Sequence, residues 1–122
     1  MSALKNLILD ADDLPTKELE IPEWGVTVTV KAMDGETRGR FAMSATDEDG
    51  NRDEQAYIQS SARLAAMVLV DPETKELIFT AEDVPALARK SAAALDRISQ
   101  VAFSISGLTE DERSTVEATF HQ

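Results

Sequence analysis

Apolar and polar residues alternate in two short stretches near the N-terminus. Residues 17–21 alternate with a period of two, and in residues 26–31 three valines alternate with two threonines and a lysine. This pattern, rich in β-branched residues, is typical of β-strands. The sequence Pro22-Glu23-Trp24-Gly25 lies between them and has the composition of a turn. The pattern therefore predicts an antiparallel hairpin.

Helical spacing of apolar residues dominates most of the remaining chain. It predicts helices over residues 2–9, 37–46 and 54–67. In the first of these, Leu4, Leu7 and Ile8 share one side. In the third, the side expected to face the core consists of Tyr57, Ile58, Ala62, Ala65 and Ala66. Residues 68–70 and 77–79 favour strands on either side of a turn at residues 71–74, which predicts a second hairpin.

The clearest helical pattern lies in the C-terminal third. Apolar residues recur at steps of three and four from Val84 to Ile105, which predicts one long amphipathic helix. Thr80 and Asp83 have the spacing of a capping box before it, and Gly107 is suited to end it. Thr109 begins a further short helix whose apolar residues are Val116 and Phe120.

These elements predict an α+β fold. The chain has 122 residues, 43% of them hydrophobic, which suits one small core. We therefore expect a single, mostly helical domain over residues 1–122, with small antiparallel β-hairpin elements and a long C-terminal amphipathic helix.

The charge balance narrows the classes of partner. There are 23 Asp and Glu against 12 Lys and Arg, giving a formal net charge of -11. No stretch is basic enough to neutralise a phosphate backbone, so we expect no nucleic-acid partner. The apolar runs are far shorter than a bilayer span, and the N-terminus has no secretory pattern, so we expect no membrane partner and a cytoplasmic location.

The residues needed for catalysis are scarce. The chain has no Cys, which excludes a thiol nucleophile, a disulfide and a thiolate metal site. The single His is His121, beside the C-terminus, where a catalytic base is poorly held. Ser2 and Lys5 have a Ser-x-x-Lys spacing, but the other motifs of that enzyme class are absent. We therefore expect no enzyme activity, no catalytic residue and no cofactor.

The acidic loop at residues 47–54 is the best candidate for a metal site. Oxygen ligands at alternate positions suit Ca²⁺. A calcium loop starting at Asp47 places Arg52 where Gly is needed and Ile58 where the closing Glu is needed. A loop starting at Ala45 has no carboxylate at its first or last ligand position. A solvated loop is the better interpretation, so we assign no metal ligand. An acidic metal-binding domain or a DNA mimic remains the alternative function.

Two features are suited to protein contact. Trp24 is a large aromatic residue outside the predicted helices, a type enriched at interfaces, although the preferred interpretation is that it covers one end of the hairpin as part of the core. The small residues at 91–94 permit close approach of another helix, from this chain or from another. The candidate partner-binding residues are Trp24, Ser91, Ala92, Leu95 and Ile98.

Several segments resemble one protein family. Residues 20–28, Glu-Ile-Pro-Glu-Trp-Gly-Val-Thr-Val, resemble a segment near the start of the tail assembly chaperones of long-tailed bacteriophages and prophages. The sequences at residues 70–74 with Phe79, and at residues 90–98 with Leu108, are similar to later segments of that family. These motifs are structural and mark no active site.

The resemblance implies a non-enzymatic role in virion morphogenesis. Such chaperones bind the tape measure protein, a long and largely helical polypeptide, and keep it soluble while tail tube subunits polymerise around it. The tape measure protein is therefore the expected partner, with the tail tube protein as a further candidate and self-association expected. The expected location is the cytoplasm of the bacterial host, without retention in the mature virion.

Overall fold

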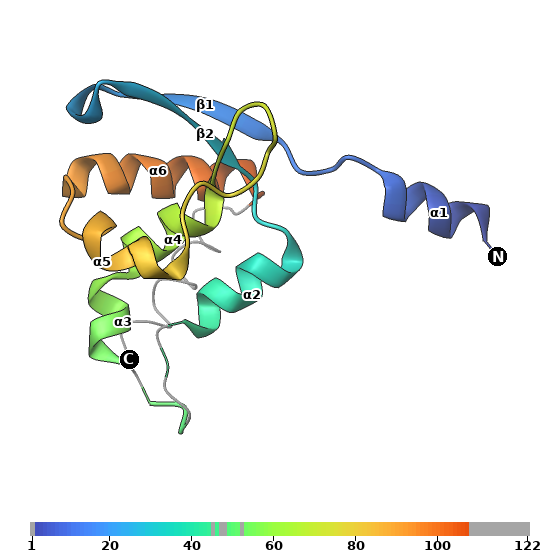
Figure 1. Cartoon of the computed structure of the whole chain (residues 1–122). Helices are drawn as coiled ribbons and strands as arrows, with labels where there is room; N and C mark the ends of the chain where they lie inside the picture. Colours follow the sequence, from blue (N-terminus) through green and yellow to red (C-terminus); the bar gives the residue numbers. More distant parts are fainter. Residues whose placement is uncertain (1, 45, 47–48, 52, 108–122) are drawn as a thin grey trace.

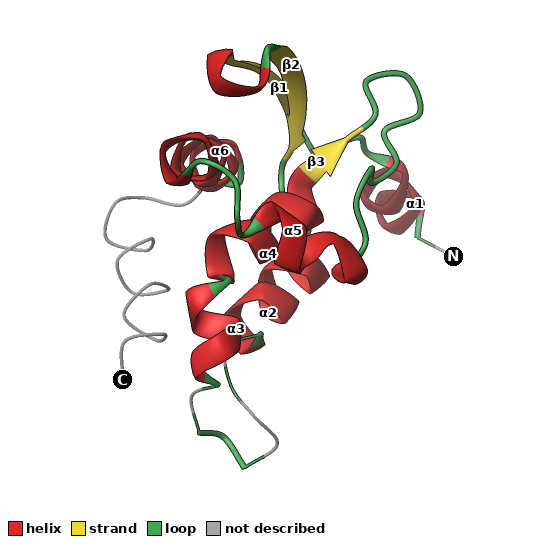
Figure 2. Ribbon diagram, turned by 60° about the vertical axis from the view of Figure 1, so that its left-hand side comes forward, coloured by secondary structure: helices red, strands yellow, loops and turns green. Residues whose placement is uncertain are grey.

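A small antiparallel sheet forms one side of the molecule (Figures 1 and 2). The structure is a computed structural model that describes residues 2–44, 46, 49–51 and 53–107. Strand β1 (Thr16–Ile21) pairs along its whole length with β2 (Val26–Lys31). The short 3-10 helix η1 (Pro22–Trp24) joins them, and Gly25 completes the turn with a φ of 65°. This left-handed conformation favours glycine. The predicted first hairpin is confirmed.

The predicted second hairpin forms only in part, because residues 69–71 pair antiparallel with residues 76–78 through a single bridge and its flanking hydrogen bonds. Strand β3 (Leu69–Val70) pairs with β2, so the sheet has the order β1-β2-β3. Leu77 returns beside Val70 in a single bridge, and no strand extends from it over residues 77–79. The Asp71 carboxylate accepts hydrogen bonds from the backbone N–H groups of Glu73 and Thr74, which shapes the intervening loop. After the bridge the chain turns toward the helices, where Phe79 packs against the core, and strand pairing ends.

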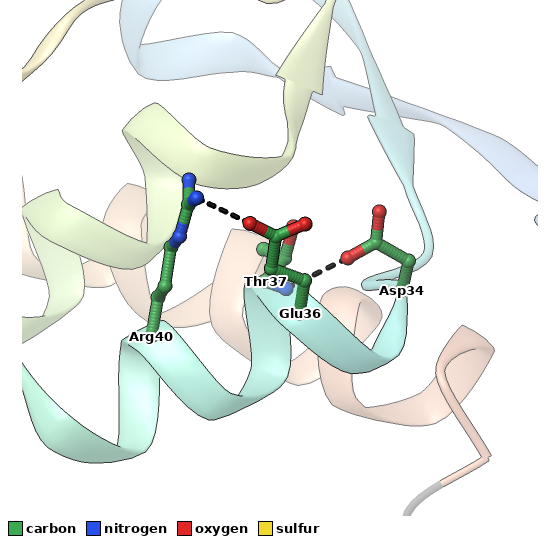
Figure 3. A network of polar contacts seen from close by, with 4 residues as sticks. All are labelled: Asp34, Glu36, Thr37 and Arg40. Carbon is green, nitrogen blue, oxygen red and sulfur yellow. Dashed lines mark hydrogen bonds and ion pairs between the residues drawn. The ribbon is translucent and has the colours of Figure 1, made fainter.

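Three helices connect the hairpin to β3. Helix α2 (Gly35–Met43) begins and ends earlier than predicted. It begins earlier because Asp34 caps it by accepting a hydrogen bond from the Thr37 N–H at 2.7 Å. Figure 3 shows this cap beside an ion pair between Glu36 and Arg40, one turn apart. The helix predicted over residues 54–67 is instead two helices, α3 (Glu54–Ile58) and α4 (Ser60–Val68), joined at Gln59. Ile58 is exposed, contrary to the prediction.

The long C-terminal helix is also divided. A 3-10 turn, η2 (Ala81–Asp83), leads into α5 (Val84–Leu87), and α6 (Ala92–Ile105) follows a break. The break arises because Ser91 leaves the helical conformation and caps α6, accepting a hydrogen bond from the Ala94 N–H at 3.2 Å. The capping box of Thr80 and Asp83 is confirmed, and Gly107 follows α6 with a φ of 81°. The helix predicted from Thr109 lies outside the described residues.

The core lies between the sheet and the helices. The hairpin packs on α6, α6 packs on α4, and α2 and α5 contact other parts of α4 (Figures 1 and 2). Phe41 of α2 and Phe103 of α6 meet at a ring-centroid distance of 6.1 Å. The largest fully buried side chains come from the sheet, α4 and α6: Ile21, Val30, Leu64, Val68, Leu69 and Ile98. The predicted α+β class is confirmed.

The first helix extends away from this core. Helix α1 (Ala3–Asp10) forms as predicted and is capped by Ser2. An extended linker at residues 11–15 separates it from the rest of the fold (Figure 1). Residues 2–13 are all exposed, so the apolar side of α1 contributes nothing to the core described above.

Candidate partner-binding surface

An apolar hollow of about 200 Å³ lies where the hairpin turn faces α5. Its open lining is almost entirely apolar carbon. We call it the Trp24 hollow, and it is lined by Trp24, Phe79, Asp83, Ala86, Leu87 and Lys90. Such a concave apolar surface with a few polar groups at its edge is typical of a site that binds another molecule.

The hairpin turn positions Trp24. Trp24 ends η1, directly before the turn at Gly25, and its ring packs partly on the main core. The neighbouring Glu23 forms an ion pair with Arg97 of α6, which ties the turn to the helix beneath it. The hydrogen bond from Arg97 holds the pKa of the Glu23 carboxyl below its usual range.

The opposite wall of the hollow depends on the start of α5. The Asp83 carboxylate accepts a hydrogen bond from the Thr80 N–H at 2.8 Å, which fixes the turn that leads from Phe79 into the helix. Leu87 then points into a small second core with Ala62, Ala66 and Val84, while Ala86 is exposed. The hollow is therefore built by backbone capping and packing on both sides.

A second hollow lies on the other side of Lys90. We call it the Ile58 hollow; its lining includes Ile58, Ser61, Ala88, Lys90, Ala92 and Leu95. It is more polar than the Trp24 hollow, but Ile58 leaves 71% of its surface exposed there. Because Lys90 lines both hollows, they form neighbouring parts of one surface around the junction of α5 and α6.

Similarity to known proteins identifies the family of the chain. The family model described as phage tail assembly chaperone matches residues 3–118. The chain belongs to the phage tail assembly chaperone family. Its structure is similar to that of the bacteriophage HK97 tail assembly chaperone, with a TM-score of 0.58 and 18% sequence identity. That match covers 85% of this chain and 98% of the HK97 chain, and it shows a common fold. No protein with a curated description matches.

The five partner-binding residues predicted from the sequence occupy different environments in this family member. Trp24 lines the first hollow, and Ala92 is exposed at the edge of the second. Ser91 uses its hydroxyl to cap α6. Leu95 and Ile98 lie in the core, with 5% and 0% of their surfaces exposed. The structure thus brings Trp24 and Ala92 to neighbouring hollows and places Ile98 inside the core.

Besides Asp83, which the sequence marks only as a capping residue, sequence reasoning misses four lining residues of the Trp24 hollow: Phe79, Ala86, Leu87 and Lys90. The hydrophobic pattern places Phe79 in a strand and the other three in a continuous helix. The signal that could have found them is Ser91, whose side chain can start a new helix after Lys90. A helix break at that position separates α5 from α6 and exposes the surface at their junction.

The other candidate sites have structural uses. Ser2 accepts a hydrogen bond from the Lys5 N–H at 3.3 Å, so the Ser-x-x-Lys spacing is a helix cap. Asp53, from the acidic loop, accepts a hydrogen bond from the Ala56 N–H and caps α3. Among the described residues, no three acidic or His side chains are grouped to hold a metal ion. Asp47, Glu48, Arg52 and His121 lie outside the described residues.

No helix within the described ranges combines the length and the apolar character needed to cross a lipid bilayer.

Proposed function

We propose that this tail assembly chaperone binds the tape measure protein through the Trp24 and Ile58 hollows and keeps it soluble during tail tube assembly. The observation that carries this proposal is the open apolar lining of the Trp24 hollow in a chain of the tail assembly chaperone family. The role is non-enzymatic and needs no cofactor. It is performed in the cytoplasm of the bacterial host, and the chaperone does not remain in the mature virion.

The chemistry of the surface suits a helical client. An amphipathic helix binds a groove by placing apolar side chains, three or four residues apart, into successive hollows. The Trp24 hollow supplies the more apolar position, and exposed Ile58 supplies another on the far side of Lys90. A client helix lying across α5 can therefore bury part of its apolar stripe against both.

The net charge supports the proposal that the chaperone keeps its client soluble. Each chaperone carries a net charge of -11, so complexes of chaperone and client repel one another. This repulsion opposes aggregation of a client with exposed apolar surface. Bound chaperone would thus both cover the apolar stripe and add negative charge to the client.

The partner-binding residues predicted at and after the start of α6 contribute to client binding in two ways. Ala92 and Leu95 line the Ile58 hollow, where Ala92 is open to a partner. Ser91 and Ile98 hold α6 in place through its cap and its core packing. We also infer that the chaperone self-associates, because one small domain covers little of a long client. We further infer a transient contact with the tail tube protein at the end of chaperoning.

Co-expression with the tape measure protein of the same phage or prophage tests the proposal. Wild-type chaperone should raise the soluble yield of the client and co-purify with it. Ala86→Arg, which fills the Trp24 hollow from an exposed position, should lose most of this effect. Ala93→Arg is the matched control, because Ala93 is also exposed and helical but lines neither hollow. An unchanged client yield with wild-type chaperone, without co-purification, would overturn the proposal.

A further inference from the structure

Lys90 lies between the two hollows and lines both of them. Its backbone position is fixed, because its N–H donates a hydrogen bond to the Leu87 carbonyl at 3.0 Å and the next residue, Ser91, caps α6. The Lys90 side chain is exposed. A client helix that lies across both hollows therefore contacts Lys90.

The positive charge of Lys90 is available to such a client. Among the described residues, no acidic side chain forms an ion pair with the Lys90 ammonium group. Asp83 is the other charged residue that lines a hollow, and its carboxylate already accepts a hydrogen bond from the Thr80 N–H. The charge of Lys90 thus has no counterpart within the described part of the chain.

The junction of α5 and α6 carries a local excess of positive charge in an acidic chain. Residues 84–95 contain two bases, Arg89 and Lys90, and no acid, whereas the whole chain has 23 acids and 12 bases. An acidic side chain of a client is repelled by the chain as a whole, but beside Lys90 it meets a positive charge. Opposite charges placed across an interface fix its register and exclude wrong partners.

We propose that Lys90 is a specificity-determining residue, which pairs with a Glu or Asp of the client helix between the two apolar side chains that enter the hollows. This rests on the proposed function and specifies which segments of the client the surface selects. On a helix, residues three, four and seven positions apart share one face. The selected segment therefore has apolar residues at positions i and i+7 and an acidic residue at i+3 or i+4.

The aliphatic stem of Lys90 can also cover apolar surface without any use of the charge. Substitutions at this position separate the two roles. Lys90→Arg keeps the charge, Lys90→Met keeps an apolar stem alone, and Lys90→Glu reverses the charge. Arg89→Met is the matched control, because Arg89 is the neighbouring exposed base and lines neither hollow.

The test is binding of the full-length chaperone to overlapping peptides that cover the tape measure protein of the same phage or prophage. Peptides of about 25 residues are long enough to form helices, and fluorescence anisotropy gives their dissociation constants. The peptides that bind most tightly should contain the apolar–acidic–apolar pattern. Lys90→Arg and Arg89→Met should bind these peptides as wild type does. Lys90→Met should bind them about fivefold more weakly, and Lys90→Glu more weakly still.

An exchange of the two charges identifies the pair. Replacement of the acidic residue of such a peptide by Lys should weaken its binding to wild type and restore its binding to Lys90→Glu. Added salt should reduce the difference between wild type and Lys90→Met, because counterions screen a surface ion pair. The inference is overturned if Lys90→Met binds as tightly as wild type, if the exchanged pair does not regain affinity, or if the bound peptides lack the acidic position.

Failure of the proposed function gives a different result. Ala86→Arg fills the Trp24 hollow and should lose most of the binding to the same peptides. If Ala86→Arg weakens binding but the Lys90 substitutions do not, the hollow remains the client site and only the role of Lys90 is overturned. If Ala86→Arg binds as wild type does, or if no peptide binds wild type, the proposed function and the inference are both overturned.

Discussion

Arg97 on α6 forms an ion pair with Glu23, the residue next to Trp24 in the hairpin turn. The two residues are 74 positions apart in the chain. Their contact joins the tip of the sheet to the helix on which it lies, and so fixes one wall of the Trp24 hollow. An exposed ion pair adds little to stability, so its main effect is on the position of the turn.

Arg97→Gln should loosen the hairpin turn with little change in melting temperature. Trp24 is the only Trp in the chain, so its fluorescence reports on this hollow. We expect the emission of the variant to shift to longer wavelength and to be more accessible to a soluble quencher. Arg40→Gln breaks another exposed ion pair, with Glu36, and should leave the emission unchanged. Equal spectra for Arg97→Gln and wild type would contradict this role.

Ile98→Ala should destabilise the fold strongly. The Ile98 side chain is fully buried between the sheet and α4. Truncation of such a residue costs about 2–5 kcal/mol. Urea unfolding followed by circular dichroism measures the loss. Ala93→Gly, at an exposed position on the same helix, should cost about 1 kcal/mol through helix propensity alone. A loss of similar size in both variants would mean that Ile98 is not a core residue.

Ser91→Ala should remove the cap of α6 and cost about 1 kcal/mol in the free energy of unfolding. Ser91→Asp supplies an oxygen that can accept the same hydrogen bond from the Ala94 N–H, so it should retain wild-type stability. Denaturant unfolding of the three proteins makes the comparison. If the Ser91→Ala variant were as stable as wild type, α5 and α6 would not be separated by this cap.

The caps also determine the response to acid. A hydrogen bond from the Thr37 N–H lowers the pKa of Asp34, and hydrogen bonds from the Thr74 and Glu73 N–H groups lower the pKa of Asp71. A lowered pKa in the folded state stabilises the fold at pH values above the unfolded pKa of about 3.9, and this stability is lost as the pH falls through the folded pKa.

The variant Asp34→Asn tests the direction of this pH dependence of stability. Asn caps a helix about as well as Asp but does not titrate, so the variant should be close to wild type in stability at neutral pH. Its stability should then fall less steeply below about pH 4, with the slope from Asp71 and Glu23 remaining. Thermal unfolding from neutral to acid pH measures the stability at neutral pH and its loss in acid. Parallel curves of stability against pH for the variant and wild type would contradict the effect of Asp34.

The elements that local chemistry determines are predictable from the sequence. The alternating valines of β2, the turn at Gly25 and the capping box before α5 all act over a few residues, and each is evident in the pattern. The prediction of the second hairpin holds only in part, because the pairing of β3 also depends on a distant partner. Val70 pairs with Leu77 across the turn, as a hairpin requires, but its strand also pairs with β2, which is far away in the sequence.

The hollows can be predicted only in part, because they depend on where helices break. Periodicity continues unchanged from Val84 to Leu95, so it cannot reveal that α5 ends before Ser91. The same periodicity predicts correctly that Leu95 and Ile98 face the same side, which is the core. Trp24 is recognisable by its size, whereas Ala86 carries no signal in the sequence and is placed at the hollow by the fold.

Site-specific photo-crosslinking in cells that express both proteins tests the central claim most directly. A crosslinking amino acid is placed at position 86, in the Trp24 hollow, or at position 93, outside both hollows. We expect the tape measure protein to be captured from position 86 and not from position 93. Capture from position 93 alone, or no capture from position 86 while the client is soluble, would contradict binding at the Trp24 hollow.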